Sequence, residues 1–375
     1  MGALRRSHAA AALALVGLLL LLLARLPPSL RAAPRPAPLS LPQQQPPVSA
    51  ASVSVAATAP RTSPSSTAVA TASAAPANRT TAAAKAPVPA KAPAKGPAPA
   101  EERVPLVREL YTAGHERPHP ELCPALGAKV RLLVMVASAP AHAAARDAVR
   151  LTWGHFASRA DVALAFVLGQ APAPLRAALD AEDALYGDLV VGRFVDSYSN
   201  LTLKTLSLLE WADTYCPRAP HVLKTDDDMF INVPRLLGFA AARASVRGTI
   251  WGKVMRGSRP KRARSSKYWV PPAQFPGAVF PAFATGPAYL LSGDCCARLL
   301  AAAGPQRFVR LEDVFVTGVV AQAAGLRRVL APDFYNKRVA PHPCAVQRGL
   351  AIHMVRYHEQ FDLWRKLLDG KTKCT

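Results

Sequence analysis

Short apolar runs alternate with longer stretches of helical spacing through the middle of the chain. The runs consist mainly of Val, Leu, Ala and Phe, as is usual for strands buried on both faces. The expected elements are strands at 130–136, 162–169, 188–194 and 221–223, and helices at 144–153 and 201–215. Strands that alternate with helices indicate an α/β fold, with a mostly parallel sheet and helices on both of its faces.

The amino terminus has the pattern of a targeting segment. Arg5, Arg6 and His8 precede a long apolar run. Because positive charge stays in the cytosol, this pattern predicts a cytosolic tail at 1–8 and a transmembrane signal-anchor at 9–25. A cleaved signal peptide is the alternative. Either interpretation places the rest of the chain in the lumen of the secretory pathway.

A low-complexity segment follows the apolar run. Residues 26–104 are mostly Pro, Ala, Ser and Thr, so they bury too little apolar surface to fold, and we expect a disordered stem. The lumenal catalytic domain is then expected at 105–375. In a lumenal protein, the Asn-X-Thr sequons at Asn78 and Asn200 become acceptors for N-glycosylation.

The chain carries a large excess of positive charge. Its 375 residues include 46 Lys and Arg against 24 Asp and Glu, for a net charge of +22. Such a balance can indicate a nucleic-acid partner. The basic residues are spread along the chain, however, without interleaved aromatic residues or zinc-finger spacing. We therefore expect no nucleic-acid binding.

The cysteines are compatible with disulfides in an oxidising lumen. They are Cys123, Cys216, Cys295, Cys296, Cys344 and Cys374. Six cysteines permit up to three bridges, and the sequence does not reveal their connectivity. Neighbouring cysteines rarely bond to each other, because the geometry is strained. We therefore expect Cys295 and Cys296 to bond to two distant partners.

Three consecutive carboxylates, Asp226, Asp227 and Asp228, follow the short strand at 221–223. Their mutual repulsion is unfavourable unless a cation neutralises it. Mg²⁺ and Mn²⁺ bind carboxylate oxygens and leave positions open for phosphates. A solvated turn that caps the next helix is the alternative. Ligands bind beyond the carboxyl ends of strands in such sheets, so this location favours a metal-nucleotide site.

Other positions can carry chemistry, each with a simpler alternative. Arg146 and Arg150 share one helix face and could hold a diphosphate, or could be a solvated face. Asp313 precedes an apolar helix expected at 314–323, where it would act as a general base or cap that helix. His353 lies in an apolar stretch, where a buried core histidine is the alternative to a ligand. Residues 256–267 contain six basic side chains, which indicates an exposed loop or the border of an anionic substrate.

Taken in order, several motifs resemble the Golgi family of β-1,3-galactosyltransferases and β-1,3-N-acetylglucosaminyltransferases. The resemblance covers about residues 123 to 370, nearly all of the expected folded region. The matching stretches are 146–154, 166–169, 196–205, 224–232, 280–292 and 312–314.

This resemblance implies a GT-A type fold, with a mixed nucleotide-sugar-binding sheet. It also implies transfer of a sugar from a UDP-sugar with inversion, using Mn²⁺ or Mg²⁺. The implied site consists of Asp313 as catalytic base, Asp228 and His353 as metal ligands, and Arg146, Arg150, Lys204, Asp226 and Asp227 as donor-binding residues.

The donor sugar is less clearly indicated. Lys224-Thr225 and residues 200–205 resemble the galactosyltransferase branch more closely. Pro287 stands where the family usually has a small residue, which puts sugar specificity and full activity in doubt. The expected function is transfer of galactose from UDP-galactose to the 3-hydroxyl of an acceptor sugar on glycoprotein or glycolipid glycans. N-acetylglucosamine transfer is the near alternative, and a weakly active glycan-binding protein is the alternative from another class.

The resemblance also implies a cellular location. Together with the expected anchor at 9–25, it predicts a single-pass type II protein of the Golgi membrane. The catalytic domain would then lie in the lumen, where UDP-sugar donors and glycan acceptors are its partners.

Overall fold

The computed structural model describes residues 103–374. The predictions for the tail at 1–8, the anchor at 9–25, the stem at 26–104 and the sequon at Asn78 lie outside these residues. Within the part that is described, no helix is both long and apolar enough to cross a membrane.

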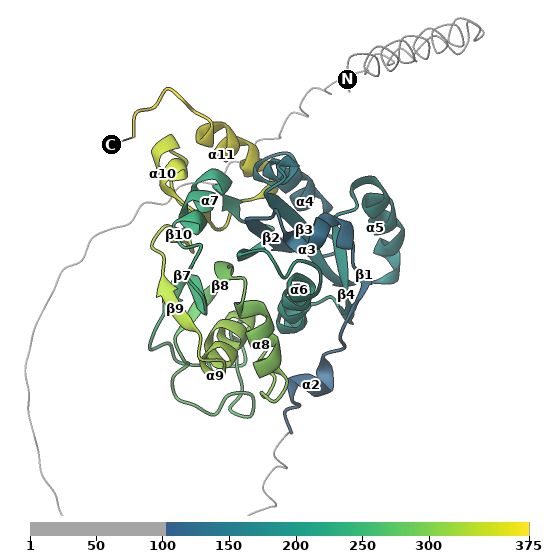
Figure 1. The fold of residues 1–375 in the computed structure, drawn as a ribbon. Coiled ribbons are helices and arrows are strands. Elements are labelled where there is room, and N and C mark those ends of the chain that lie inside the picture. Colours follow the sequence, from purple (N-terminus) through teal and green to yellow (C-terminus); the bar gives the residue numbers. More distant parts are fainter. Residues whose placement is uncertain (1–102, 375) are drawn as a thin grey trace, which may run out of the picture. The chain divides into compact units, whose positions relative to one another are not determined.

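An eight-stranded mixed sheet forms the centre of the domain (Figure 1). In spatial order, its strands are β1 (His115–Arg117), β4 (Leu189–Val195), β3 (Val162–Gln170), β2 (Leu132–Ala137), β5 (His221–Asp226), β8 (Phe283–Ser292), β7 (Thr249–Met255) and β9 (Arg327–Leu330). A three-stranded sheet consists of β10 (Phe334–Tyr335), β11 (Ala351–Ile352) and β6 (Phe230–Ile231).

Helices and helical turns connect these strands. The α-helices are α2 (Val107–Leu110), α3 (Pro124–Gly127), α4 (Ala143–Arg150), α5 (Ala173–Tyr186), α6 (Leu201–Tyr215), α7 (Val233–Ala241), α8 (Cys295–Ala303), α9 (Ala321–Ala323), α10 (Pro343–Arg348) and α11 (Gln360–Leu367). Short 3₁₀ turns are η2 (Pro120–Leu122), η3 (Trp153–Ser158), η4 (Tyr198–Asn200) and η6 (Tyr357–Glu359), and η5 (Val314–Val320) is a π-helix.

The strand directions confirm an α/β fold with a mixed sheet. Strands β2, β3, β4 and β5 run parallel, whereas β8 runs antiparallel to both β5 and β7. Two local expectations change. The strand expected at 221–223 continues to Asp226, so the first carboxylate of the triplet belongs to β5. The helix expected at 314–323 is a π-helix up to Val320, a form that often occurs at functional sites.

Alternate side chains of the strands build two cores, one on each face of the sheet. On β2, Leu133 and Met135 pack with residues of α6, α8 and η5. Leu132, Val134 and Val136 point the other way and pack with residues of α7 and α11. Because successive side chains of a strand point to opposite faces, the apolar run of β2 supplies both cores, and the strand is fully buried.

The parallel strands end at one edge of the sheet, and this edge gathers the polar residues. Ala137 at the end of β2 is in register with Asp226 at the end of β5. Since β8 runs the other way, its amino-terminal half lies at the same edge, with Ala288 opposite Thr225. The loop after β4 also starts there, at Asp196. The sheet therefore brings four chain segments together at this edge.

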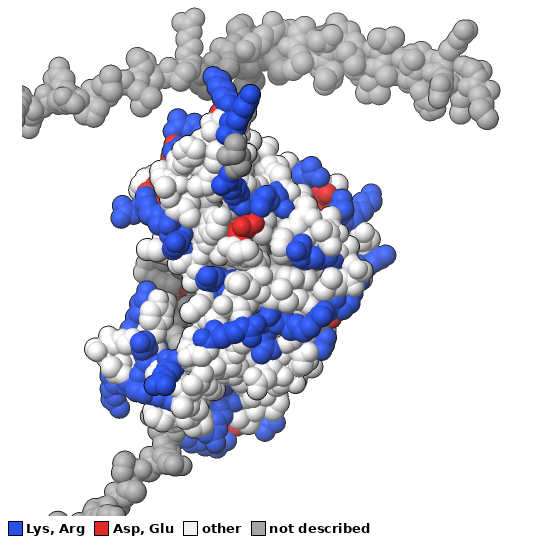
Figure 2. All heavy atoms as spheres, turned by 90° about the vertical axis from the view of Figure 1, so that its left-hand side faces the viewer, with Lys and Arg blue, Asp and Glu red and all other residues white. Residues whose placement is uncertain are grey.

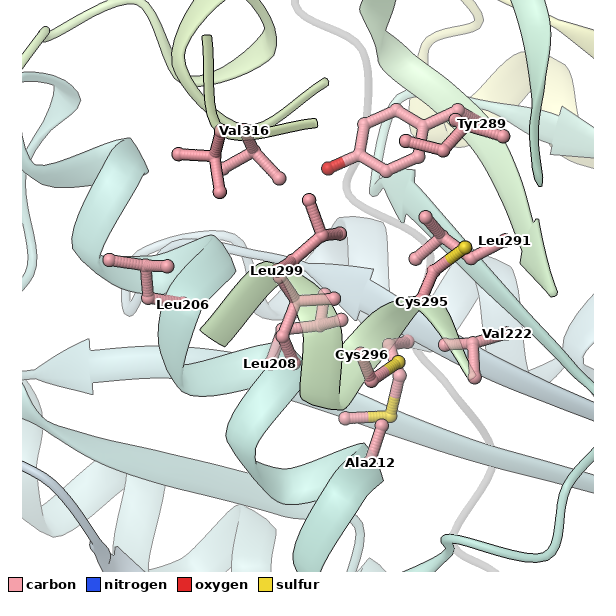
Figure 3. Packing of buried hydrophobic residues seen from close by; sticks show 14 of the residues in the cluster. Leu206, Leu208, Ala212, Val222, Tyr289, Leu291, Cys295, Cys296, Leu299 and Val316 are labelled. Carbon is pink, nitrogen blue, oxygen red and sulfur yellow. The ribbon is translucent and has the colours of Figure 1, made fainter. Parts of the chain in front are cut away.

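The cysteines pair differently from the expectation. Disulfides join Cys123 to Cys216 and Cys344 to Cys374. Cys295 and Cys296 are free thiols, so the prediction of two distant partners is wrong. Both point into the core between α8 and the sheet, beside Val222, Leu291 and Leu299 (Figure 3). Burial raises the pKa of Cys295 to about 11, so this thiol stays neutral and packs as a small apolar side chain.

Candidate active site

Lys224 is the buried cation at the carboxyl end of β5. Its side chain is only 4% exposed, and its Nζ donates to Asp226 Oδ1 at 2.6 Å and to the Gly286 carbonyl at 2.7 Å. A second carboxylate, Glu312 Oε2, lies 3.7 Å from the same nitrogen. The ammonium thus joins β5 to β8 and to the segment that precedes η5.

Asp313 lies at the amino end of η5, directly after Glu312. Its Oδ2 accepts a hydrogen bond from the Gly286 N–H at 3.0 Å, and its Oδ1 accepts one from the Val314 N–H at 2.9 Å. The neighbouring Glu312 accepts a hydrogen bond of 2.6 Å from the Tyr289 hydroxyl. Gly286 is therefore shared, because its N–H holds Asp313 while its carbonyl holds Lys224.

Asp226, Glu312 and Asp313 form an acidic cluster around Lys224. The pKa values of these acids are shifted from their ordinary values. Burial raises the pKa of Asp313, although the backbone hydrogen bonds from Val314 and Gly286 oppose this change. Burial raises the pKa of Glu312 to about 7, and the negative charge of Asp313 adds to the effect. Burial also raises the pKa of Asp226, against the attraction of Lys224. Desolvation by itself lowers the pKa of Lys224, but Asp226 and Glu312 more than offset it and the pKa rises.

Asp227 points away from this cluster, into the loop after β2. Its Oδ2 accepts hydrogen bonds from the Ser138 hydroxyl at 2.7 Å and from His142 Nδ1 at 2.9 Å. The hydrogen bond to Asp227 raises the pKa of His142. Asp227 thus fixes the β2–α4 loop at the same edge as the rest of the triplet.

Arg146 and Lys204 hold that loop from the other side. The guanidinium of Arg146 is fully buried and forms a bidentate pair with Glu182, at 2.6 and 2.7 Å, while it also donates to the Ala139 carbonyl at 2.6 Å. The ammonium of Lys204 donates to the Ser138 carbonyl and pairs with Asp196 at 2.9 Å. The structure therefore brings Arg146, Lys204 and the triplet together around the β2–α4 loop.

Arg150 has a different environment. It pairs with Asp188 and Glu182, each at 2.7 Å, and its guanidinium stacks on the Tyr186 ring at 3.9 Å. These contacts tie α4 to α5 and β4. They account for Arg150 as a structural residue, and its contact with a donor stays a prediction.

Asp228 and His353 form a pair at the surface of the same edge. His353 Nε2 lies 3.3 Å from Asp228 Oδ2, and the two side chains are 22% and 49% exposed. Pairing of β6 with β11 brings the two segments together, and the Val355 N–H donates to the Asp228 carbonyl at 2.9 Å. Residues 103–374 contain no cluster of three or more His, Cys, Asp or Glu side chains placed to hold a metal ion.

The chemistry of this pair fits a divalent metal of the Mn²⁺ type. A carboxylate and an imidazole are ligands that such ions accept, and two protein ligands leave the other positions to water and phosphate oxygens. The partial exposure of both side chains gives an ion access from solvent.

A small hollow lies next to the cluster. Its lining residues include Met229, Lys253, Thr285, Pro287 and Tyr335. Pro287 falls where the β7–β8 register is irregular, between the pairs formed by Gly252 and Val254. A proline is tolerated at a bulge because no ladder hydrogen bond is lost there.

Comparison with known proteins identifies the family. The family model described as "Galactosyltransferase" matches residues 144–332. The protein from Rattus norvegicus named UDP-GlcNAc:betaGal beta-1,3-N-acetylglucosaminyltransferase 7 is 32% identical over 275 residues, 68% of each chain. This chain belongs to the galactosyltransferase family.

Other relatives carry both kinds of name. The Homo sapiens lactosylceramide 1,3-N-acetyl-beta-D-glucosaminyltransferase is 34% identical and covers 68% of this chain and 70% of its own. Beta-1,3-galactosyltransferase 2 of Mus musculus is 31% identical and covers 64% and 59%. The family prediction is confirmed, and the protein is a glycosyltransferase of the hexosyltransferase class, with β-1,3-glycosyl transfer as the activity of the family.

A solved galactosyltransferase, LgtC in complex with donor and acceptor sugar analogues, covers 64% of this chain and 96% of its own. It is 10% identical, with a TM-score of 0.34. This likeness is too loose to bear on substrate or mechanism.

Several residues of this galactosyltransferase-family site have no local signal in the sequence. Gly286 and Tyr289 reach Asp313 and Glu312 only because η5 packs against β8. Ser138 could have been found, because it directly follows the expected strand at 130–136 and so stands at a carboxyl end.

The sequon at Asn200 lies at the start of α6. Asn200 Nδ2 donates to the Val195 carbonyl at 2.9 Å, and the hydroxyl of Thr202 is buried, donating to the Val309 carbonyl at 2.7 Å. Since the sequon hydroxyl must be reachable by the glycosylating enzyme, a glycan at Asn200 would have to be attached before the domain folds. Glycosylation at this position stays a prediction.

The raised pKa of Glu312 predicts a pH-dependent stability. Folding raises this pKa from 4.5 to about 7, so the folded state keeps a proton that the unfolded state releases. The stabilisation is complete below pH 4.5 and is lost as the pH rises to about 7. For one such group the loss is about 3 kcal/mol. Glu312→Gln should remove this dependence, as measured by urea unfolding across that pH range.

The control for this measurement is Glu116→Gln, which changes an exposed carboxylate in β1. It should leave the pH dependence of the unfolding free energy as in the wild type. If the unfolding free energy changed with pH equally in the wild type and in Glu312→Gln, Glu312 would not be the titrating group.

Proposed function

We propose that the protein is an inverting β-1,3-galactosyltransferase. It moves galactose from UDP-galactose to the 3-hydroxyl of an acceptor sugar on a glycoprotein or glycolipid glycan, in the Golgi lumen. The observation that carries this proposal is Asp313, a buried carboxylate of raised pKa, held by two backbone N–H groups beside Lys224 and Asp226.

Asp313 is the base in this proposal. A carboxylate whose pKa is raised by burial is a stronger base than one in water. It takes the proton of the acceptor 3-hydroxyl while that oxygen attacks the anomeric carbon of the donor. The bond from this carbon to the diphosphate breaks on the opposite face, and UDP leaves with the bonding electrons. One displacement inverts the anomeric configuration, so no second nucleophile is required.

The other polar residues bind the donor. Asp228 and His353 would hold a Mn²⁺ or Mg²⁺ ion, whose charge stabilises the leaving diphosphate. Asp226 pairs with Lys224 and stands two positions before Asp228, and in this proposal it meets the nucleotide. Arg146, Lys204 and Asp227 act through the β2–α4 loop, whose shape they fix.

Galactose is favoured as the donor sugar by the small size of the hollow at Pro287. The ring of Pro287 forms part of its wall, next to Gly286 in the chain. The 2-hydroxyl of galactose needs less space there than an N-acetyl group. N-acetylglucosamine is the second candidate, because several relatives are named as N-acetylglucosaminyltransferases.

The test is a panel of UDP-sugars offered to the full-length protein with Mn²⁺ and with acceptors that end in GlcNAc, GalNAc or Gal. We expect transfer from UDP-galactose, with a β-1,3 linkage in the product. Transfer from UDP-GlcNAc alone would replace the proposed donor. Binding without transfer from any donor would favour the glycan-binding alternative.

Removal of one proposed metal ligand is expected to weaken donor binding. Asp228→Ala should lower the Mn²⁺-dependent affinity for UDP by more than about 100-fold, a larger loss than changes in outer-shell residues produce. Calorimetric titration of UDP with and without Mn²⁺ measures this change. Asp180→Ala removes an exposed aspartate on α5 and should bind UDP like the wild type. Equal Mn²⁺-dependent affinity in Asp228→Ala would contradict the assignment.

A further inference from the structure

The chain between β7 and β8 contains many Lys and Arg residues but no Asp or Glu. No Asp or Glu stands between Asp228 and Asp294. The exposed basic residues in the second half of β7 and the loop after it are Lys253, Arg256, Arg259, Lys261, Arg262, Arg264 and Lys267. Among the described residues, none of these side chains forms a salt bridge. Like charges that are not neutralised repel each other, so this loop favours an anionic partner.

The location of the loop connects it to the proposed site. It leaves the carboxyl end of β7 and returns to the amino end of β8, close to Thr285 and Gly286. Figure 2 looks onto the side of the molecule where β7 and β9 lie in Figure 1 and shows far more Lys and Arg than Asp and Glu. The side of the molecule that carries β7 and β9 therefore has a predominantly positive surface.

Arg310 is a further cation, and it stands three positions before Asp313 in the chain. Its guanidinium carbon lies 6.0 Å from the centre of the Tyr198 ring, and this tyrosine is 55% exposed. Its Nε is buried and has no hydrogen-bond partner among the residues that the structure describes. An unpartnered buried donor is unfavourable, so the Arg310 side chain would gain a hydrogen bond by turning this N–H toward an acceptor atom of a ligand.

Lys267 and Tyr268 of the β7–β8 loop form a second pair of a cation and an exposed aromatic ring. The Lys267 ammonium is 4.8 Å from the centre of the Tyr268 ring, which is 49% exposed. The hydrogen bond to Tyr268 raises the pKa of Lys267, and Tyr198 adds to this change. Each of the two pairs thus combines an exposed aromatic ring with a cation that has no carboxylate partner among residues 103–374.

Hydrogen bonds fix these segments to the segment that carries Asp313. The Thr202 hydroxyl donates to the Val309 carbonyl at 2.7 Å, which ties the start of α6 to residue 309. The Arg310 N–H donates to Gln274 Oε1 at 3.4 Å, which ties the β7–β8 loop to the same segment. The tyrosines and cations therefore keep a defined position relative to the base.

We propose that Tyr198, Lys267, Tyr268 and Arg310 form an acceptor subsite for a saccharide that carries an anionic group. The aromatic faces pack against the sugar ring, and the unpaired Arg310 and Lys267 bind carboxylate, sulfate or phosphate oxygens, to which charge-assisted hydrogen bonds are strong. This proposal rests on the proposed function, because it takes Asp313 as the base beside which the acceptor binds.

The kinetic test compares matched acceptors with the full-length protein and Mn²⁺. One acceptor is a neutral oligosaccharide, and the others are the same oligosaccharide with one sulfate, one phosphate or one uronic acid. We expect at least one anionic acceptor to have a kcat/KM about tenfold or more above that of the neutral one. The group (sulfate, phosphate or uronic acid) that gives the largest kcat/KM relative to the neutral acceptor identifies the anion that the subsite prefers.

The variant for this test is the double substitution Arg310→Gln and Lys267→Gln. It should raise KM for the anionic acceptor about tenfold, while transfer to the neutral acceptor and affinity for UDP stay within about twofold of the wild type. Arg176→Gln, which removes one exposed charge on α5, is the control. It should change neither the KM for the anionic acceptor nor the transfer to the neutral acceptor. A ratio near one in the wild type, or the same loss in Arg176→Gln, would overturn the subsite.

Calorimetric binding of the sulfated oligosaccharide to the protein with Mn²⁺ and UDP separates the two proposals. Binding that the double variant weakens supports the subsite even where no transfer occurs, and loss of transfer alone then counts against the proposed function. Equal affinity for sulfated and neutral oligosaccharides counts against the subsite.

Discussion

Asp313→Asn is expected to reduce sugar transfer by about 10² to 10⁴-fold, the usual contribution of a general base. The amide keeps the shape of the side chain and can still accept a hydrogen bond from the N–H of Gly286 or Val314. It cannot take a proton from the acceptor hydroxyl. Affinity for UDP with Mn²⁺ should stay close to that of the wild type, because Asp313 is not among the proposed donor ligands.

Initial rates at saturating donor, with calorimetric UDP binding alongside, check this result. The chain offers a matched control in Asp294, which precedes α8 as Asp313 precedes η5 and accepts hydrogen bonds from the Gly248 N–H at 2.9 and 3.1 Å. Asp294 follows the end of β8, at the opposite edge of the sheet. Asp294→Asn should retain transfer. If Asp313→Asn were as active as the wild type, another group would be the base.

Lys224→Met is expected to destabilise the fold by about 3–5 kcal/mol, the usual effect of removing one partner from a buried ion pair. The methionine fills a similar volume, but Asp226 and Glu312 then lose the cation that lies 2.6 and 3.7 Å from their oxygens. The Gly286 carbonyl also loses its donor. Urea unfolding near neutral pH measures the change.

The loss in Lys224→Met should become smaller at lower pH. Glu312, whose pKa is about 7 in the wild type, becomes neutral on protonation, and fewer uncompensated charges then remain. Lys366→Met is the control, because it removes a lysine that pairs with Asp362 at the surface of α11, where an ion pair contributes less than about 1 kcal/mol. An equally small effect of Lys224→Met would show that the buried carboxylates do not depend on this cation.

Much of the α/β domain follows from local patterns. The apolar run at 130–136 predicted β2, and helical spacing at 201–215 predicted α6 with the bounds that the structure shows. These elements are readable because burial on both faces requires uninterrupted apolar residues and because no Gly or Pro interrupts α6. The end of β5 was less predictable, since the charges of Lys224 and Asp226 do not resemble a buried strand.

The candidate site was predictable in its acids and not in their partners. Asp226, Asp227 and Asp228 stand out as a triplet, but each points in a different direction, toward Lys224, Ser138 and His353 respectively. Sequence neighbours on a turn diverge, and what each contacts depends on strands far away in the chain. The sequence also could not predict that Cys295 and Cys296 are free thiols. Their surroundings depend on tertiary packing and not on the spacing of cysteines along the chain.

The sequence by itself determined the fold class, the family and the identity of the acids at the end of β5 and before η5. These depend on local periodicity and on motifs that lie within short stretches of chain. The tertiary structure alone decided that Gly286 is shared by Lys224 and Asp313, and that Arg310 lies near the Tyr198 ring. Such contacts arise when distant segments pack together, as β8 packs beside β5 and against η5, and they leave no signal in either segment alone.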